Sequence, residues 1–156
     1  MPHYKRCLEN AICREVQPPS QSQSSDSHLP LAGLRVVLNA GNGSGYFFNQ
    51  ILHDLGADVS NSIHLTPHGS FPKSGVPNPE YSAMIDETTR VCEECDADIG
   101  IMLDTDADRC GFVVPTTRDE GSSCRKFEAL NRNRLIALLA VIFQSSSPGC
   151  TFVTDR

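Results

Sequence analysis

Two short apolar runs constrain the fold of this chain most strongly, because each ends in residues that do not continue a β-strand. The run Leu34–Leu38 contains two valines between leucines, and it leads into Asn39–Gly45, which holds three glycines. The run Ile99–Leu103 leads directly into Asp104, the first of three aspartates within five residues. Apolar runs of this length between turn residues are typical of strands buried on both faces. The sequence therefore predicts a covered sheet with a glycine-rich turn and an acidic loop at its strand ends.

Helical patterns alternate with these strands. Apolar residues recur at helical spacing over 47–55, again from about 80 to 95, and on nearly every side of the segment 130–143. Further strands are expected at 57–65, at 111–115 and from 151 onward. This alternation predicts the α/β class, as a three-layer α/β/α sandwich with a mixed, mostly parallel sheet. The short connection between Leu103 and Gly111 predicts one antiparallel pair in that sheet.

A connector divides the chain near its beginning. Residues 1–16 carry apolar residues at spacings of three and four, which predicts an amphipathic helix. Residues 17–30 are rich in Ser, Gln and Pro and offer little to bury, so we expect a connector there. Residues 31–156 hold the predicted strands and are expected to form the α/β/α core of a single domain, with a surface excursion at 116–127.

The charge of the chain limits its partners. Its 19 acidic residues outnumber its 13 Lys and Arg, which gives a net charge of −6, and no basic cluster offsets the repulsion from nucleic acid. No apolar run of signal-peptide length follows the N-terminus, and no segment reaches the length of a membrane span. We therefore expect no nucleic-acid partner, no membrane and a cytoplasmic location. The seven cysteines are scattered, and Cys92 and Cys95 fall in a helical pattern, which favours reduced structural thiols.

The three aspartates after the second apolar run form the strongest candidate site. Two carboxylates ~4 Å apart repel by about 4 kcal/mol at an effective dielectric constant near 20, and a cation relieves that repulsion. Asp104, Asp106 and Asp108 offer hard oxygen ligands of the kind that Mg²⁺ prefers. Their place at the end of a buried strand is where open α/β sheets bind ligands. An apolar strand followed by Asp-x-Asp also occurs in phosphatases with an aspartate nucleophile, so that class stays open, with Asp104 as the nucleophile.

Several motifs together resemble those of a known family. They match, in order, the second α/β/α domain of the α-D-phosphohexomutases, the phosphoglucomutase and phosphomannomutase superfamily, and the likeness extends from about residue 4 to 156. The segments that carry it are Asn39–Gly45, Gly69–Pro72 with Pro77–Glu80, Ala97–Arg109, and Asn131–Leu138.

The resemblance implies the function of this domain. Members of the family transfer phosphate between positions 1 and 6 of a hexose, and loop aspartates hold Mg²⁺, which corresponds here to Asp104, Asp106 and Asp108. Arg109 resembles the family's loop arginine and is expected either to contact a phosphate or to brace the loop. The Asn39–Gly45 run is expected to serve mainly as a tight strand-to-helix turn. His68 stands where the family commonly has Asp and is expected to be a surface loop residue.

The same resemblance implies what this chain lacks. In the family the phosphoserine segment precedes this domain and the sugar-binding loops follow it, so no catalytic residue is expected here. Hexose phosphate would then bind only in a longer chain, and the isolated chain is expected to be inactive. The alternative is a stand-alone binding module without catalysis. The apolar helix at 135–143 would then need an oligomer partner, or neighbouring domains, to cover it.

Overall fold

The computed structural model describes residues 2–16, 29–72, 75–116 and 125–154. Its centre is a four-stranded sheet in the order β1-β2-β3-β4. The strands are β1 (Val36–Asn39), β2 (Ile99–Leu103), β3 (Cys110–Pro115) and β4 (Phe127–Ala129). β1 pairs with β2 in parallel, whereas β2 with β3 and β3 with β4 are antiparallel. The α/β class, the mixed sheet and the antiparallel pair across the acidic loop are confirmed.

The sheet is less parallel than the sequence predicts, because only one of these three ladders is parallel. The expected strand at 57–65 forms just two isolated parallel bridges, one from Asp58 to Arg35, just before β1, and one from Ile63 to Asn39 at the end of β1. No strand forms at Thr151–Thr154. Conversely, β4 lies at the end of the stretch expected to be a surface excursion. Its three residues are too few to show the alternation from which a strand is recognised.

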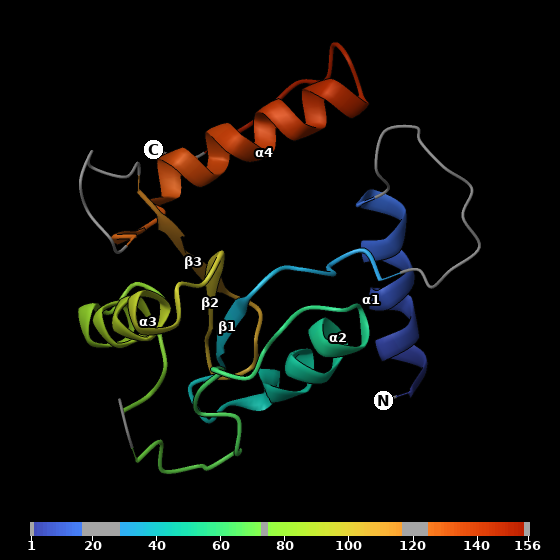
Figure 1. The fold of residues 1–156 in the computed structure, drawn as a ribbon. Coiled ribbons are helices and arrows are strands. Elements are labelled where there is room, and N and C mark those ends of the chain that lie inside the picture. The colour runs from blue at the N-terminus through green and yellow to red at the C-terminus, as the bar shows by residue number, and fades with distance from the viewer. Residues whose placement is uncertain (1, 17–28, 73–74, 117–124, 155–156) are drawn as a thin grey trace.

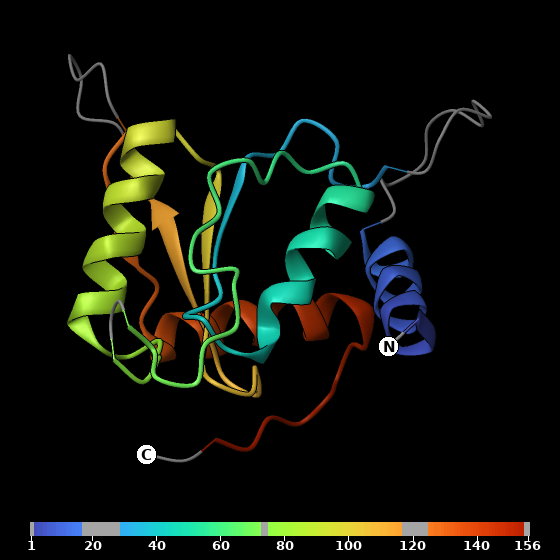
Figure 2. The same ribbon diagram turned by 90° about the horizontal axis from the view of Figure 1, so that it is seen from below.

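Helices cover both faces of the sheet. The helices are α1 (Pro2–Glu15), η1 (Ser44–Phe47), α2 (Phe48–Asp54), α3 (Ser82–Cys95) and α4 (Arg132–Ser146). Figure 1 places α3 on one face of the strands and α2 on the other, with α1 outside α2. Figure 2 shows the same succession from a perpendicular direction. The three layers predicted from the alternating pattern are therefore present.

Two apolar clusters hold these layers together. Between the sheet and α3, seven buried residues pack into one cluster: Val37, Met84, Cys92, Ala97, Met102, Val113 and Phe127. On the α2 face a smaller cluster contains Val36, Ala57 and Val59, with Leu52 and Ile101 partly buried against it. Alternate residues of each strand point to opposite faces, so the consecutive apolar residues of β1 and β2 suit a sheet covered on both sides.

Helix α1 packs on the outer side of α2, as Figures 1 and 2 both show. The ring of Tyr4 meets that of Phe47 edge-on, with centroids 6.0 Å apart, and Lys5 forms an ion pair with Asp54. The helix predicted over 1–16 is thus present as α1. Most of the predicted connector, 17–30, falls outside the described residues, and the division of the chain into helix, connector and core stays a prediction.

Helix α4 is exposed along its length. No residue of α4 is buried, and Val141 and Phe143 are 69% and 54% exposed. The apolar residues that are exposed on α4 are Leu138, Leu139, Val141, Ile142 and Phe143. Among the described residues, α4 included, no helix is long and apolar enough to cross a membrane. The predicted helix with apolar residues on most sides exists, and its apolar surface lacks a cover in the described part of the chain.

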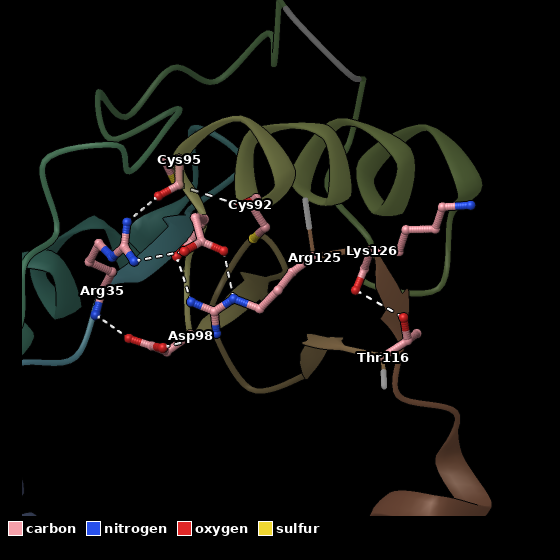
Figure 3. A network of polar contacts seen from close by, with 8 residues as sticks. Arg35, Cys92, Cys95, Asp98, Thr116, Arg125 and Lys126 are labelled. Atoms are coloured by element: carbon pink, nitrogen blue, oxygen red, sulfur yellow. Dashed lines mark hydrogen bonds and ion pairs between the residues drawn. The ribbon is translucent and has the colours of Figure 1, made fainter. Parts of the chain in front are cut away.

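An ion-pair network joins the end of α3 to the beginnings of β1 and β4. Asp96 follows α3 in a left-handed conformation with φ of 51° and accepts hydrogen bonds from Arg125 at 2.6 Å and from Arg35 at 3.0 Å. Asp98 accepts from the Arg35 backbone N–H at 2.8 Å and from Arg125 at 3.3 Å. Figure 3 shows Arg35, Arg125 and Asp98 close together beside Cys95 at the end of α3. The network therefore ties three elements together at one end of the sheet.

We expect this network to weaken in acid. The hydrogen bond from Arg125 is the main reason why the pKa of Asp96 falls from 3.8 to about 2. Because the folded-state pKa lies below the unfolded value, the stabilisation is present above about pH 4 and is lost as the pH falls toward 2. Urea unfolding at pH 6 and pH 2.5 measures it, and Asp96→Asn should lose less stability over that interval than wild type. Equal acid losses in Asp96→Asn and the exposed control Asp86→Asn would contradict this prediction.

Candidate metal site

The acidic loop is the turn of a β-hairpin. Leu103 at the end of β2 pairs with Cys110 at the start of β3, so residues 104–109 make the whole connection. The Asp104 N–H donates to the Arg109 carbonyl at 3.2 Å, and the Ala107 N–H donates to the Asp104 carbonyl at 3.3 Å. Ala107 has a φ of 62°, a left-handed conformation that few residues with a side chain adopt. The loop is therefore tightly turned and bonded to itself.

This turn brings the three predicted carboxylates together. One carboxylate oxygen from each of Asp104, Asp106 and Asp108 lies within 4.8 Å of the others. Asp104 is fully buried, whereas Asp106 and Asp108 are exposed. Among the described residues this is the one group of three His, Cys, Asp or Glu side chains arranged in this way. Three hard oxygen donors, two of them open to solvent, fit a cation such as Mg²⁺ that keeps water in its other coordination positions.

Arg109 braces the buried member of the triad. Its backbone N–H donates to Asp104 Oδ1 at 3.1 Å and its Nε donates to Asp104 Oδ2 at 2.7 Å. Each carboxylate oxygen has a second lone pair, so these bonds leave Asp104 able to bind a cation. The Arg109 side chain is 63% exposed, and its Nε also lies 3.6 Å from Asp108 Oδ1. Of the two roles expected for Arg109, these contacts favour bracing the loop.

The pKa values of Asp104 and Asp108 shift in opposite directions. Burial alone would raise the pKa of Asp104, but the Arg109 backbone N–H and the positive charge of its side chain outweigh burial and lower that pKa. The pKa of Asp108 is raised, mainly by the negative charge of Asp106 and further by Asp104. The repulsion within the triad therefore raises the pKa of Asp108. A cation between the carboxylates would remove the cause of this shift.

The glycine-rich turn lies against the back of the acidic loop. A Cβ atom on Gly43 would lie 2.7 Å from the Thr105 carbonyl oxygen, and one on Gly45 would lie 2.5 Å from a methyl group of Leu103. Real Cβ atoms do not approach other atoms so closely, and the atom near Gly43 belongs to the backbone, so glycine is required at that position. At Gly45 a larger residue would instead have to displace the end of the Leu103 side chain. The run expected to form a tight turn does so, and Gly43 allows two backbones to touch.

Other candidate residues lie outside this group. His68 is exposed and its Nδ1 accepts a hydrogen bond from the Ser70 backbone N–H at 3.2 Å, as expected for a loop residue. His64 and Glu87, which sequence reasoning missed, form a pair at 2.8 Å between the 57–65 segment and α3. Nothing in the local sequence marks that pair, because its members are far apart along the chain.

The structure disfavours two other kinds of site, one with a reactive cysteine and one with an aspartate nucleophile. Cys92 and Cys95 are unpaired on α3, and burial raises the pKa of Cys92 to about 12, which keeps the thiol protonated and unreactive. Asp104 would be the nucleophile of an aspartate phosphatase, but its carboxylate is fully buried and both of its oxygens are bonded to Arg109. A nucleophile needs access to the phosphorus atom, so the geometry disfavours that alternative.

The sequence matches a family of known enzymes. Residues 14–118, more than half of the chain, match the family described as phosphoglucomutase/phosphomannomutase, alpha/beta/alpha domain II. A phosphomannomutase of Salmonella typhimurium is 38% identical over 130 residues, which are 80% of this chain and 26% of that protein. A probable phosphoglucosamine mutase of Pyrococcus horikoshii is 38% identical over 96 residues, covering 61% of this chain and 19% of that protein.

A solved structure shares the fold. A phosphoglucomutase/phosphomannomutase family protein from Burkholderia thailandensis superposes with a TM-score of 0.63 at 22% sequence identity, over 90% of this chain and 26% of that one. The chain thus spans about a quarter of the length of these relatives. From the match over residues 14–118 and the identity to the Salmonella enzyme, the chain belongs to the phosphohexomutase superfamily and corresponds to its second α/β/α domain.

Proposed function

We propose that this chain is the magnesium-binding domain of a phosphohexomutase. The convergence of Asp104, Asp106 and Asp108 on one point carries the proposal, since each contributes an oxygen within 4.8 Å of the others. Membership of the phosphohexomutase superfamily supports it independently. In this role the buried Asp104 is the fixed ligand, braced by Arg109, and the exposed Asp106 and Asp108 close on the cation from the solvent side.

The proposed role of the domain in phosphoryl transfer follows from the position at which its carboxylates would hold a cation. Bound Mg²⁺ supplies positive charge that stabilises the negative charge developing on the phosphoryl oxygens during transfer. The hairpin itself keeps the three carboxylates at the end of β2, and the exposure of Asp106 and Asp108 leaves the site open toward a phosphate carried by another part of the enzyme. The guanidinium of Arg109, mostly exposed, can meet that phosphate while its Nε stays on Asp104.

The substrate is proposed to be a hexose phosphate, bound only when the rest of a mutase is present. The chain covers about a quarter of its relatives, so groups that bind sugar and carry the phosphate are expected elsewhere. Relatives named phosphomannomutase and phosphoglucosamine mutase support a hexose phosphate without choosing the sugar. The isolated chain is accordingly proposed to bind the cation without mutase activity, and a cytoplasmic location remains a prediction.

Titration of Mg²⁺ into the 156-residue chain tests the proposal directly. Isothermal calorimetry should report one site per chain, and saturating Mg²⁺ should raise the unfolding temperature because the cation binds the folded hairpin. No binding in the millimolar range would contradict the proposal. The mass of the native polypeptide is the companion measurement, because a mass well above 17.0 kDa would place the domain in a longer enzyme.

A stand-alone binding module is the second candidate, and the exposure of α4 favours it. Exposed apolar patches of several adjacent side chains mark surfaces that bind other proteins. If the chain exists alone, we expect α4 to drive self-association. Sedimentation equilibrium should then give a mass that rises above 17.0 kDa with concentration, and the double substitution Val141→Gln with Phe143→Gln should restore the monomer.

The control for that experiment is Val76→Gln, because Val76 is 61% exposed in the loop before α3. This variant should associate as wild type does. A monomer of 17.0 kDa at every concentration, in wild type and variants alike, would contradict self-association and leave neighbouring domains as the expected cover of α4.

A further inference from the structure

A buried polar pair lies directly behind the glycine-rich turn. Asn39, the last residue of β1, and Thr88 of α3 are both fully buried. The Asn39 Nδ2 donates to Thr88 Oγ1 at 3.0 Å, and the Thr88 hydroxyl donates to the Met84 carbonyl at 2.7 Å. On its other side, Asn39 Oδ1 accepts the Gly41 backbone N–H at 3.0 Å. The pair therefore fixes the first residues of the turn to α3.

The glycine-rich turn, fixed in this way to α3, is in turn hydrogen-bonded to the acidic loop. Gly41 is left-handed with φ of 54°, and the Gly43 N–H closes the turn by donating to the Ala40 carbonyl at 2.8 Å. The next N–H, that of Ser44, donates to the Thr105 carbonyl at 2.9 Å. Ser44 is the first residue of η1, and the first N–H of a helix has no partner within the helix. It is therefore free to hold the loop between Asp104 and Asp106.

The contact between Ser44 and Thr105 matters because the negative charges of the acidic loop work against the conformation that the loop adopts. Three carboxylates within 4.8 Å of one another repel, and the exposed loop would relieve that repulsion by spreading apart. A bond from outside the hairpin to the carbonyl between two of the aspartates resists that movement. The glycines allow this bond, since a side chain on Gly43 would meet the Asp104 and Thr105 carbonyl oxygens at 3.0 and 2.7 Å.

We propose that Asn39, Thr88 and Ser44 are positioning residues, which hold the acidic loop in its cation-binding form before the cation arrives. The inference rests on the proposed function, because it concerns the same cation site. It assigns to α3, which contributes no ligand, a part in setting the affinity of that site. The connection runs from Thr88 through Asn39 and the glycine turn to the Thr105 carbonyl.

The first test breaks the contact between the turn and the loop. Ser44→Pro deletes the N–H that the Thr105 carbonyl accepts and puts a ring carbon in its place, which pushes that carbonyl away. The backbone itself suits proline, because Ser44 is the first residue of a helix and the preceding Gly43 is extended, with ψ of −168°. Ser44→Ala keeps the N–H and is the matched control. With Mn²⁺ titrated into the full 156-residue chain, Ser44→Pro should bind about tenfold more weakly than Ser44→Ala, the lower end of the loss that follows when groups orienting metal ligands are removed.

The second test acts from α3. Thr88→Val keeps the shape of the side chain but leaves the Asn39 amide without its acceptor, whereas Thr88→Ser keeps the hydroxyl. Thr88→Val should weaken Mn²⁺ binding several-fold and Thr88→Ser should not. Cys92→Ala is the stability control, because Cys92 is equally buried on α3, one turn after Thr88, and belongs to the apolar cluster between the sheet and α3. It should lower the unfolding temperature without changing Mn²⁺ affinity.

The outcomes separate this inference from the function on which it rests. Failure of the wild-type chain to bind Mn²⁺ would reject the cation site itself. Binding by wild type with the same affinity in Ser44→Pro, verified as folded by circular dichroism, would overturn the positioning role alone. An equal loss of affinity in Cys92→Ala and Thr88→Val would likewise overturn it, since the effect would then follow from stability.

Discussion

Asp106→Asn should weaken the binding of Mg²⁺ to this chain by about a hundredfold. The substitution keeps an oxygen at the same position but removes a negative charge, and Mg²⁺ depends on carboxylate ligands at its protein sites. Partners of metal ligands already cost about 10–100-fold when removed, so loss of a charged ligand belongs at the upper end of that range or beyond. Isothermal calorimetry at fixed ionic strength measures the change. Without cation, the variant should be at least as stable as wild type, because one repulsive charge is gone.

Glu93→Gln provides the control for this experiment. It makes the same change in net charge at an exposed position of α3, within the last turn of that helix rather than on the acidic loop. Its Mg²⁺ affinity should equal that of wild type. Equal affinities in Asp106→Asn and Glu93→Gln would show that the cation is attracted by overall charge, and the site would have to be abandoned.

Arg109→Met should lower the free energy of unfolding by about 1–3 kcal/mol in the absence of Mg²⁺. The variant leaves the fully buried Asp104 carboxylate without the Nε donor at 2.7 Å, and an unsatisfied buried polar group typically has a cost of this size. The pKa of Asp104 should rise, because burial is then opposed by the backbone N–H without the guanidinium charge. Urea unfolding at pH 7 measures the change in stability.

Mg²⁺ should restore part of that stability, since a cation replaces the positive charge that Arg109 supplied. The increase in unfolding free energy on adding Mg²⁺ should therefore be larger in Arg109→Met than in wild type. Arg109→Lys, which keeps the charge but lacks Nε, should fall between the two. If Arg109→Met unfolds like wild type with and without Mg²⁺, the bracing role of Arg109 is wrong and contact with a phosphate becomes its expected role.

What the sequence predicts well in this chain depends on neighbouring residues. The stretch 99–111 is enough to predict the acidic triad, the buried strand β2 and the antiparallel turn between β2 and β3. The segment 57–65 has a strand-like composition, but only two of its residues form bridges, to Arg35 and Asn39, because pairing depends on a partner that local composition does not specify.

The parts of the site that sequence reasoning missed are contacts between distant residues. Asn39 and Thr88 are 49 positions apart, and neither is unusual in its local pattern. A buried Asn at a strand end becomes recognisable only when the threonine opposite it is known. The hydrogen bond between Ser44 and Thr105 joins two backbone groups, so it does not depend on which side chains the sequence has at these positions and cannot be predicted from them. The resemblance to phosphohexomutases predicted the three ligands but not the contacts that position them.

All three proposed ligands lie within a hairpin turn of six residues, which has a consequence for how such an enzyme is made. Residues 104–109 close a local β-hairpin, and β-hairpins form in about 1–10 μs, so all three carboxylates come from one locally formed element. In the proposed role, the cation site is therefore complete as soon as this domain has folded, and Mg²⁺ would bind without waiting for residues from any other part of an enzyme.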